Sequence, residues 1–311
     1  MSEIGFGAWG IGGVSKGSTS YGPTDDNSSI RALNFALDSG INFFDTSNVY
    51  GEGHSESLIG KTFLKFRDRV LIATKVGLVN YDEPANYSIN NLSKSLQGSL
   101  KRLKTDYIDL LQLHNPSPDI IHHNHDILTW VNQLKKKGII RAFGVSVRSP
   151  KEGIIAIEKL NPESIQVNFN LLDHRAIESG LMKSAATNQV SLIARTPLCF
   201  GFLSGKLHST THFDKQDHRS LWPNQHIHNW VRGSKKILSC KEDSSLQTDT
   251  QFALRFCLSY PRVTTAIPGV LNELEVKENI KASDLGPLQD NEIEDVQKTY
   301  HKLQFIFDNE S

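Results

Sequence analysis

Residues 41–61 read INFFDTSNVYGEGHSESLIGK. The apolar run at the start of this stretch predicts a buried strand that ends at Asp45, and Tyr50 follows five residues later. Two further apolar runs also end on a polar side chain, the run 70–75 at Lys75 and the run 107–114 at His114. Barrel enzymes keep their chemistry at the carboxyl ends of parallel strands, so we expect these four side chains to meet on one rim.

Apolar runs of this kind alternate with helix-period segments along the whole chain. One helical stripe, for example, consists of Leu92, Leu96, Leu100 and Leu103. The strands that we expect cover residues 4–8, 41–45, 70–75, 107–113, 141–146, 164–169, 190–195 and 263–267. Alternating strands and helices indicate repeated βα units around a parallel sheet. The sequence therefore predicts a closed (β/α)8 TIM barrel that forms a single domain over residues 1–311.

An open, doubly wound sheet is the structural alternative. It requires a Gly-x-Gly-x-x-Gly turn that leads into the first helix. The segment Gly5–Gly10 superficially fits this string, but the residues that follow, 11–22, are rich in Gly and Ser and carry no helical pattern. We therefore reject a dinucleotide-binding fold of that type.

The composition limits the functional class. Hydrophobic residues make up 38% of the chain, charged residues 22%, and the formal net charge is zero, which suits a soluble globular protein and argues against a nucleic-acid partner. The three scattered cysteines suit free thiols in a reducing compartment. We find neither an apolar run long enough to span a membrane nor a secretory signal, and expect a cytoplasmic protein. Histidines cluster in 119–125 and 208–228, but their spacing completes no metal site.

The segment 45–61 is close to the signature of the aldo-keto reductases, and the chain resembles that family from Ile4 to about Tyr300. The resemblance implies NAD(P)H-dependent reduction of an aldehyde or ketone, perhaps derived from a sugar, to an alcohol. Tyr50 would be the general acid, Lys75 the cation that lowers the pKa of Tyr50, and Asp45 the group that keeps Lys75 charged. His114 would donate a hydrogen bond to the substrate carbonyl.

The resemblance also implies a cofactor site in three parts. On the nicotinamide side it places Gly7, Ala8 and Trp9, with Ser146 and Gln166 on the carboxamide and Arg195 stacked on the ring. The residues expected along the pyrophosphate are Pro197, Leu198, Gly201, Leu203, Gly205 and Lys206. Those expected at the adenosine are Pro268, Gly269, Glu275, Glu278 and Asn279. NADPH is the expected cofactor, and NAD remains possible.

Three regions outside the strands complete the expected architecture. We expect a long loop after the seventh strand, from Thr196 to about Leu246, and a helix outside the barrel that carries Ile293, Val296, Tyr300 and Leu303. Family members usually begin with a short hairpin, whereas Met1 here lies almost at the first strand. Four aromatic residues could line the substrate pocket or simply pack: Trp9, Tyr81, Trp222 and Trp230.

Two other functions remain open at this point. The chain could be an NAD-linked sugar or polyol dehydrogenase, which Glu275 alone favours, or a nicotinamide-binding redox sensor without catalysis. For the reductase and for the dehydrogenase, the expected partner is a small-molecule carbonyl or alcohol. The sequence leaves the substrate, the direction of the reaction and the oligomeric state undetermined.

Glu275 generates the first prediction. A carboxylate beside the adenosine would repel a 2′-phosphate, with Lys277 and Arg219 as candidate compensating cations. Glu275→Arg should therefore tighten NADPH binding relative to NADH, measured by the quench of tryptophan fluorescence. An unchanged ratio of the two affinities would remove Glu275 from the argument.

Overall fold

The computed structural model describes residues 1–15, 20–123, 125–242 and 246–303. Eight parallel strands follow one another around the sheet in chain order, as predicted. The bridges Ile4↔Ala266 and Gly7↔Gly269 join the first strand region to the last and close the barrel. The strands are β1 (Phe6–Gly7), β2 (Phe43–Asp45), β3 (Leu71–Val76), β4 (Ile108–His114), β5 (Ile140–Ser146), β6 (Ser164–Asn168), β7 (Ser191–Arg195) and β8 (Val263–Ile267). The predicted barrel is thus confirmed.

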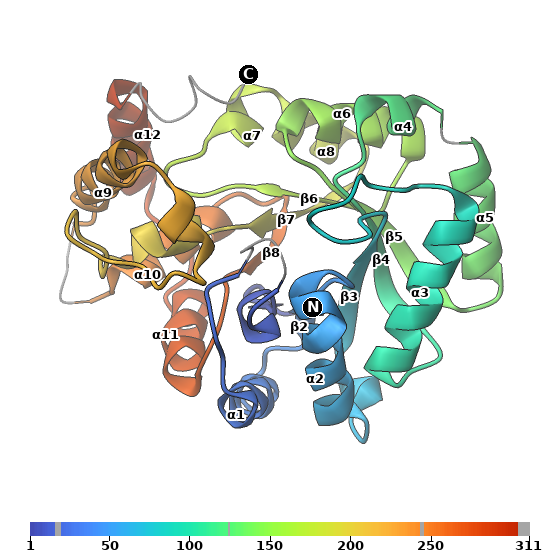
Figure 1. Cartoon of the computed structure of the whole chain (residues 1–311). Coiled ribbons are helices and arrows are strands. Elements are labelled where there is room, and N and C mark those ends of the chain that lie inside the picture. Colours follow the sequence, from blue (N-terminus) through green and yellow to red (C-terminus); the bar gives the residue numbers. More distant parts are fainter. Residues whose placement is uncertain (16–19, 124, 243–245, 304–311) are drawn as a thin grey trace.

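Helices surround the strands on the outside of the barrel (Figure 1). They are α1 (Asp26–Asp38), α2 (His54–Phe63), α3 (Ile89–Leu103), α4 (Pro118–His122), α5 (His125–Lys136), α6 (Pro150–Leu160), α7 (Arg175–Glu178), α8 (Leu181–Thr187), α9 (Asn224–Leu238), α10 (Asp249–Leu258), α11 (Glu273–Asp284) and α12 (Asp290–Lys302). Among the described residues, none of these helices has both the length and the apolar character needed to cross a bilayer.

Local sequence chemistry explains where a helix such as α1 begins and ends. The Asp25 side chain accepts a hydrogen bond from the Ser28 N–H at 2.7 Å, which satisfies one of the free donors at the helix start. Ala32, Leu33 and Ala36 form its buried face. Gly40 follows with φ +94°, a conformation that glycine adopts without a steric penalty. The chain then enters β2, which carries Asp45 to the rim.

The interior of the barrel is filled by a small cluster of its own. Phe43, Ala73, Leu110, Ile193 and Ile267 point inward and pack together, separately from the large core between strands and helices. The barrel is therefore a packed core, and the side chains at the carboxyl ends of the strands lie on top of it.

The segment after β7 is more regular than we expected. It contains the 3₁₀ segments η4 (Cys199–Ser204) and η5 (His218–Leu221) as well as the helix α9, so the prediction of a loop was incomplete. Gly233 and Ser234 interrupt the apolar stripe of α9, yet both are buried. Small residues that allow close packing concealed the helical pattern. The predicted C-terminal helix is α12, which lies outside the barrel and packs against α9 (Figure 1).

A buried histidine makes the stability of this fold depend on pH. His174 stacks on Tyr300 and Phe256, with ring centroids 3.8 and 4.9 Å away, and its Nε2 has no hydrogen-bond partner. Burial lowers the pKa of His174 to about 3. The unfolded chain takes up a proton below a pKa of about 6.5, whereas the folded protein does not until about 3, so stability falls as the pH falls through this window.

We expect His174→Gln to remove this dependence. Between pH 7 and pH 5 the wild type should lose about 2 kcal/mol more of its free energy of unfolding than the variant. Urea denaturation of both proteins at the two pH values measures the difference. Equal losses would show that His174 does not titrate in this window.

Candidate active site

The buried ammonium of Lys75 organises the rim of the barrel. Lys75 Nζ donates to Asp45 Oδ1 at 2.5 Å, to the Thr46 carbonyl at 2.9 Å and to the Tyr50 hydroxyl oxygen at 3.1 Å. These contacts use all three hydrogens of an ammonium group. Lys75 therefore has one fixed position, and the hydrogen of the Tyr50 hydroxyl remains free to be donated elsewhere.

The electrostatics of Tyr50 differ from our expectation. We expected Lys75 to lower the pKa of Tyr50, but burial raises it, and the Asp45 carboxylate raises it further. Asp45 offsets the charge of Lys75, and Arg195 is the cation that counteracts the shift. Tyr50 is consequently a neutral phenol in this structure, which is the form that can donate a proton.

The second oxygen of Asp45 is held by two glutamines. Gln166 Nε2 donates to Asp45 Oδ2 at 2.8 Å and Gln112 Nε2 donates to it at 3.1 Å, and all three side chains are buried. Ser146 lies beside them, with its Oγ 3.4 Å from Gln166 Oε1. Gln112 was missed by the sequence analysis. Its signal was a lone amide in the otherwise apolar run 110–113.

His114 lies at the end of β4, close to Tyr50. The two rings meet edge to face, with centroids 6.2 Å apart. His114 Nδ1 is 3.2 Å from Ser47 Oγ, and the Tyr87 hydroxyl fixes the backbone by donating to the His114 carbonyl at 2.6 Å. Burial and then the charge of Lys75 lower the pKa of His114 well below its ordinary value, so the imidazole is neutral. All four predicted side chains therefore lie together at one rim.

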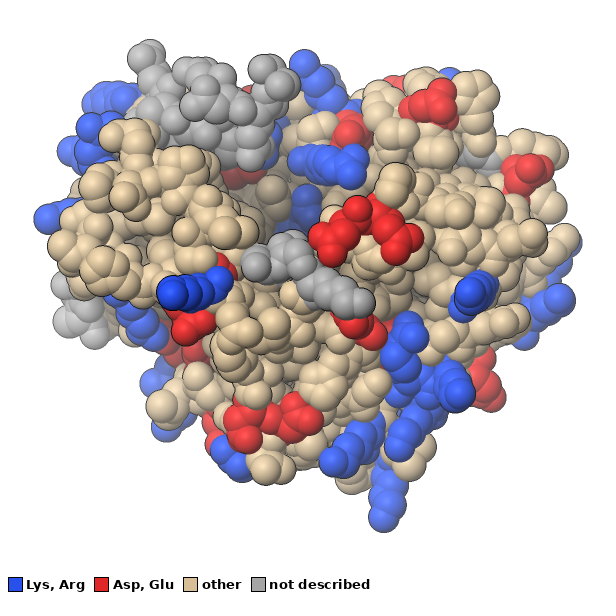
Figure 2. Space-filling view, viewed as in Figure 1, with Lys and Arg blue, Asp and Glu red and all other residues tan. Residues whose placement is uncertain are grey.

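Arg195 contributes a second cation to this rim. Its Nη2 donates to the Val147 carbonyl at 2.9 Å, while its Nε is buried without a hydrogen-bond partner. Burial lowers the pKa of Arg195, and the charges of Tyr50 and Asp45 act in the opposite direction. Figure 2 shows a hollow near the middle of the face seen in Figure 1, with Lys or Arg atoms in and around it.

The first strand brings the predicted residues Gly7, Ala8 and Trp9 to the same rim. Gly7 must lack a side chain, because an added Cβ would lie 2.7 Å from the Pro268 carbonyl. The Ala8 N–H donates to the Asp45 carbonyl at 2.9 Å. Trp9 packs on Tyr21 at 4.8 Å between ring centroids and shares a side-chain hydrogen bond with Tyr81. Trp9 and Tyr81 thus lie on the Tyr50 side of the rim.

The other two candidate pocket aromatics pack elsewhere. The ring centroids of Trp222 and Trp230 are 5.4 Å apart, and both rings contact Phe200 and Phe202 of η4. Both belong to the segment after β7 and pack there on η4. Their role in this structure is packing.

The backbone after β7 is strained in a way that suits anion binding. Three residues other than glycine have positive φ, namely Thr196 at 50°, Cys199 at 47° and Phe200 at 54°, and Gly201 follows at 92°. Such conformations cluster at functional sites, and successive N–H groups in them form concave anion sites. The predicted residues Pro197, Leu198, Gly201, Leu203, Gly205 and Lys206 all lie in or next to this segment.

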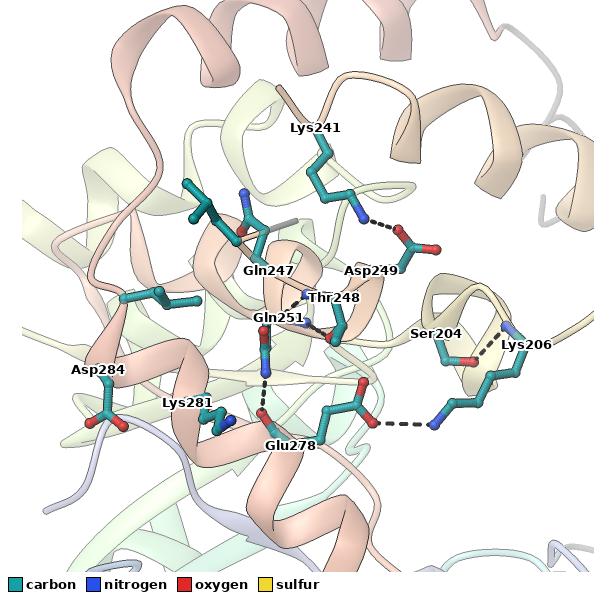
Figure 3. A pocket seen from close by; sticks show the side chains of 12 residues that line it. Ser204, Lys206, Lys241, Gln247, Thr248, Asp249, Gln251, Glu278, Lys281 and Asp284 are labelled. Atoms are coloured by element: carbon teal, nitrogen blue, oxygen red, sulfur yellow. Dashed lines mark hydrogen bonds and ion pairs between the residues drawn. The ribbon is translucent and has the colours of Figure 1, made fainter. Parts of the chain in front are cut away.

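A pocket of about 760 Å³ lies beyond this segment, between η4, α10 and α11 (Figure 3). It contains two predicted residues, Lys206 and Glu278, whose side chains form an ion pair at 3.2 Å. Neither Tyr50 nor any other member of the rim group lines it. Thr248, Gln251 and Lys281 also line it and were not predicted, because their segments carried no motif that we recognised.

The residues predicted for the adenosine differ in their surroundings. Asn279 is buried, and its Nδ2 has no hydrogen-bond partner. Pro268 and Gly269 follow β8 at the seam with β1. Glu275 does not line the pocket, because its Oε2 accepts the Leu271 N–H at 2.7 Å at the start of α11.

The two cations that might offset Glu275 are not equivalent. Arg219 binds both oxygens of Asp217 and donates to the Phe200 carbonyl at 2.9 Å, so it is already engaged. Lys277 is exposed. The charge of Lys206 does act on Glu275, where it lowers a pKa that burial raises.

The histidine clusters contain no assembled metal site in the described ranges, where no group of three or more His, Cys, Asp or Glu side chains could hold an ion.

Comparison with known proteins gives a consistent result. A model of the aldo/keto reductase family matches residues 3–301. The aldo-keto reductase YhdN of Bacillus subtilis is 35% identical over 232 residues, which cover 71% of this chain and 66% of that protein. The aldo-keto reductase yakc [NADP(+)] of Schizosaccharomyces pombe is 27% identical over 98% of this chain and 90% of that protein. The solved glycerol dehydrogenase AKR11B4 of Gluconobacter oxydans superposes with a TM-score of 0.79 at 28% identity, covering 98% and 93% of the two chains.

The Asp45–Lys75 pair yields a prediction about stability. Asp45→Asn leaves a buried ammonium without its carboxylate, which should lower the free energy of unfolding at pH 7 by about 3–5 kcal/mol. Burial lowers the pKa of Lys75, and the variant loses the carboxylate that opposes this shift. Between pH 7 and pH 10 the unfolded variant therefore binds more protons at Lys75 than the folded variant does. The loss in free energy of unfolding should shrink as the pH rises through this range.

Urea denaturation across this pH range tests the prediction. The matched control is the double variant Asp45→Asn/Lys75→Met, which removes the charge and should recover part of the loss at pH 7. A deficit that is constant with pH, or a double variant less stable than the single one, would contradict the account.

Proposed function

Since this chain belongs to the aldo/keto reductase family and is an oxidoreductase, we propose that it reduces an aldehyde or ketone with NADPH at the rim formed by Asp45, Tyr50, Lys75 and His114. The observation that carries the proposal is the hydrogen bond, 3.1 Å long, from the fully buried Lys75 Nζ to the hydroxyl oxygen of the half-buried Tyr50. It supplies a neutral acid with a cation already in contact with its oxygen.

The chain's own residues handle the proton. Tyr50 donates its hydroxyl hydrogen to the carbonyl oxygen, and the O–H bond that breaks leaves a phenolate. Lys75 stabilises that phenolate, because its N–H already points at the oxygen and its charge lies within hydrogen-bond distance. Asp45 keeps Lys75 protonated in spite of the burial that lowers the pKa of Lys75. His114, being neutral, donates a hydrogen bond to the carbonyl without adding charge.

The cofactor supplies the hydride that goes to the carbonyl carbon. The residues present suit a dinucleotide. At the nicotinamide end, Gly7, Ala8 and Trp9 would border the ring, Ser146 and Gln166 would hold the carboxamide, and Arg195 would offer a flat guanidinium with a free buried Nε. The strained backbone Cys199–Gly201 would receive the pyrophosphate.

The adenosine end would enter the pocket of Figure 3. Lys206 and Glu278 line that pocket and would hold the adenosine there. The neighbouring Asn279 is buried, and among the described residues its Nδ2 has no hydrogen-bond partner. Lys206 is a cation placed to attract a 2′-phosphate. The Schizosaccharomyces pombe relative is named as an NADP(+) enzyme, so we favour NADPH over NAD. Because Glu275 also caps α11, Glu275→Gln is the control for Glu275→Arg: it removes the charge and keeps the acceptor for Leu271.

The reverse reaction on a polyol is the second candidate. It is favoured by the similarity to the glycerol dehydrogenase of Gluconobacter oxydans over almost the whole chain. The same groups would serve it, but Tyr50 would have to act as the phenolate, held by the Lys75 ammonium, to take the proton from the alcohol. Initial rates in both directions with one carbonyl and its alcohol separate the two possibilities.

Tyr50→Phe tests the proposed acid. The variant keeps the ring but removes the one hydroxyl that contacts Lys75 Nζ among the described residues, so kcat for carbonyl reduction should fall on the order of 10²–10⁴-fold. The Kd for NADPH should stay within about twofold of the wild type. Tyr260→Phe, at a half-buried tyrosine that follows α10, is the control and should leave kcat unchanged. A kcat for Tyr50→Phe within tenfold of the wild type would overturn the assignment.

A further inference from the structure

The role proposed for His114 depends on which ring nitrogen carries its hydrogen. A neutral imidazole has one N–H and one bare nitrogen that accepts. To donate to a carbonyl, His114 must carry the hydrogen on the nitrogen that faces the site. Nδ1 faces Ser47 Oγ at 3.2 Å. Within the described part of the chain, Nε2 makes no hydrogen bond, which leaves it available to a ligand.

The partner of Nδ1 fixes the answer, because the hydrogen bond at one ring nitrogen determines the tautomer. Ser47 can act in either direction. If its hydroxyl donates to Nδ1, Nε2 carries the hydrogen and can donate to a carbonyl oxygen. If the Ser47 oxygen instead accepts a hydrogen from Nδ1, Nε2 carries no hydrogen. Nε2 and the carbonyl oxygen of the substrate are then two acceptors that face each other.

Asn48 is the competitor for the single hydrogen of Ser47. The Asn48 Oδ1 lies 3.2 Å from Ser47 Oγ, the same distance as Nδ1. The Asn48 amide cannot turn this oxygen away easily, since its Nδ2 donates to the Leu78 carbonyl at 2.9 Å. A hydrogen given to Asn48 therefore selects the tautomer of His114 that opposes carbonyl binding.

Exposure and substrate chemistry decide whether His114 Nδ1 or Asn48 Oδ1 accepts the Ser47 hydroxyl hydrogen. Ser47 and His114 are buried, whereas Asn48 is partly exposed, so water can replace the Ser47 hydrogen at Asn48 Oδ1. A carbonyl oxygen has lone pairs but no hydrogen to give. The arrangement with a hydrogen on Nε2 satisfies Nδ1, Nε2 and the carbonyl together, and the alternative sets two acceptors against each other.

We propose that Ser47 is a positioning residue, which holds His114 in the Nε2–H tautomer by donating its hydroxyl hydrogen to Nδ1. The inference rests on the function proposed above for His114. It concerns a side chain that touches neither the reacting carbon nor the reacting oxygen and acts only through the imidazole.

The first test reads the tautomer directly. Nitrogen NMR of protein labelled with ¹⁵N-histidine, with and without NADPH, distinguishes a protonated from a bare ring nitrogen, and His114→Gln identifies the signals. We expect Nε2 to be protonated and Nδ1 bare. A protonated Nδ1 in the NADPH complex would overturn the proposal, whether or not any carbonyl is reduced.

The second test uses three serine variants. Ser47→Ala should lower kcat for carbonyl reduction by about tenfold or more, leave the Kd for NADPH unchanged and bring the second tautomer into the NMR spectrum. Ser47→Thr keeps the hydroxyl and should restore kcat to within about threefold. Ser29→Ala, at a buried serine of α1, should change neither readout.

The outcomes separate the two levels of the argument. An unchanged kcat and tautomer in Ser47→Ala would refute the role of Ser47 while leaving the reductase function intact. A wild type that binds NADPH, shows the expected tautomer and reduces no carbonyl would refute the proposed function instead. A loss in Ser47→Ala that Ser47→Thr does not recover would indicate a packing defect and contradict the proposal.

Discussion

The buried charge of Lys75 is the constraint on which the rest of the site depends. An ammonium away from water costs several kcal/mol unless its charge and all its hydrogens are matched. Asp45, the Thr46 carbonyl and the Tyr50 oxygen meet that requirement, and Gln112 and Gln166 in turn hold Asp45. The hydrogen of Tyr50 is the one polar group of this network with no acceptor among the described residues. The demand created by one buried cation thus leaves the Tyr50 hydroxyl hydrogen available to a ligand.

The parallel barrel makes this arrangement possible with little loop structure. Asp45, Lys75, His114, Ser146, Gln166 and Arg195 lie at or near the ends of β2, β3, β4, β5, β6 and β7. Register brings them level: Lys75 pairs with Gln112, His114 with Ser146 and Ser146 with Gln166. Because the strands are hydrogen-bonded to both neighbours, these side chains are held by the most rigid part of the fold. The strained segment after β7 and the pocket behind it then extend the site away from Tyr50.

Apolar runs were sufficient to predict the eight strands and to place Asp45, Lys75 and His114 at strand ends, because both depend on local pattern. The four rim residues, Tyr50 included, were assigned as a group through the resemblance of the segment 45–61 to the family signature. The pKa of Tyr50 was predicted with the wrong sign, because burial and then the Asp45 carboxylate raise it, and Arg195 is the cation that opposes them. Gln112 was overlooked because an amide inside a strand has meaning only when its partner, Asp45, is known. Helix α9 was missed because hydropathy does not count Gly233 and Ser234 as apolar, although close packing buries both of them. The capping contact of Glu275 follows the Asn272-x-x-Glu275 spacing of a helix start, which the sequence analysis did not use.

The most direct test of the account is whether the rim binds a nicotinamide dinucleotide at all. Titration of the wild-type protein with NADPH and with NADH, followed by tryptophan fluorescence, requires no knowledge of the substrate. Trp9 lies on the Tyr50 side of the rim and should report on occupancy. The account predicts a saturable quench with both an affinity and an amplitude larger for NADPH. No saturable response to either dinucleotide, in protein shown by circular dichroism to be folded, would contradict the proposed site and the function built on it.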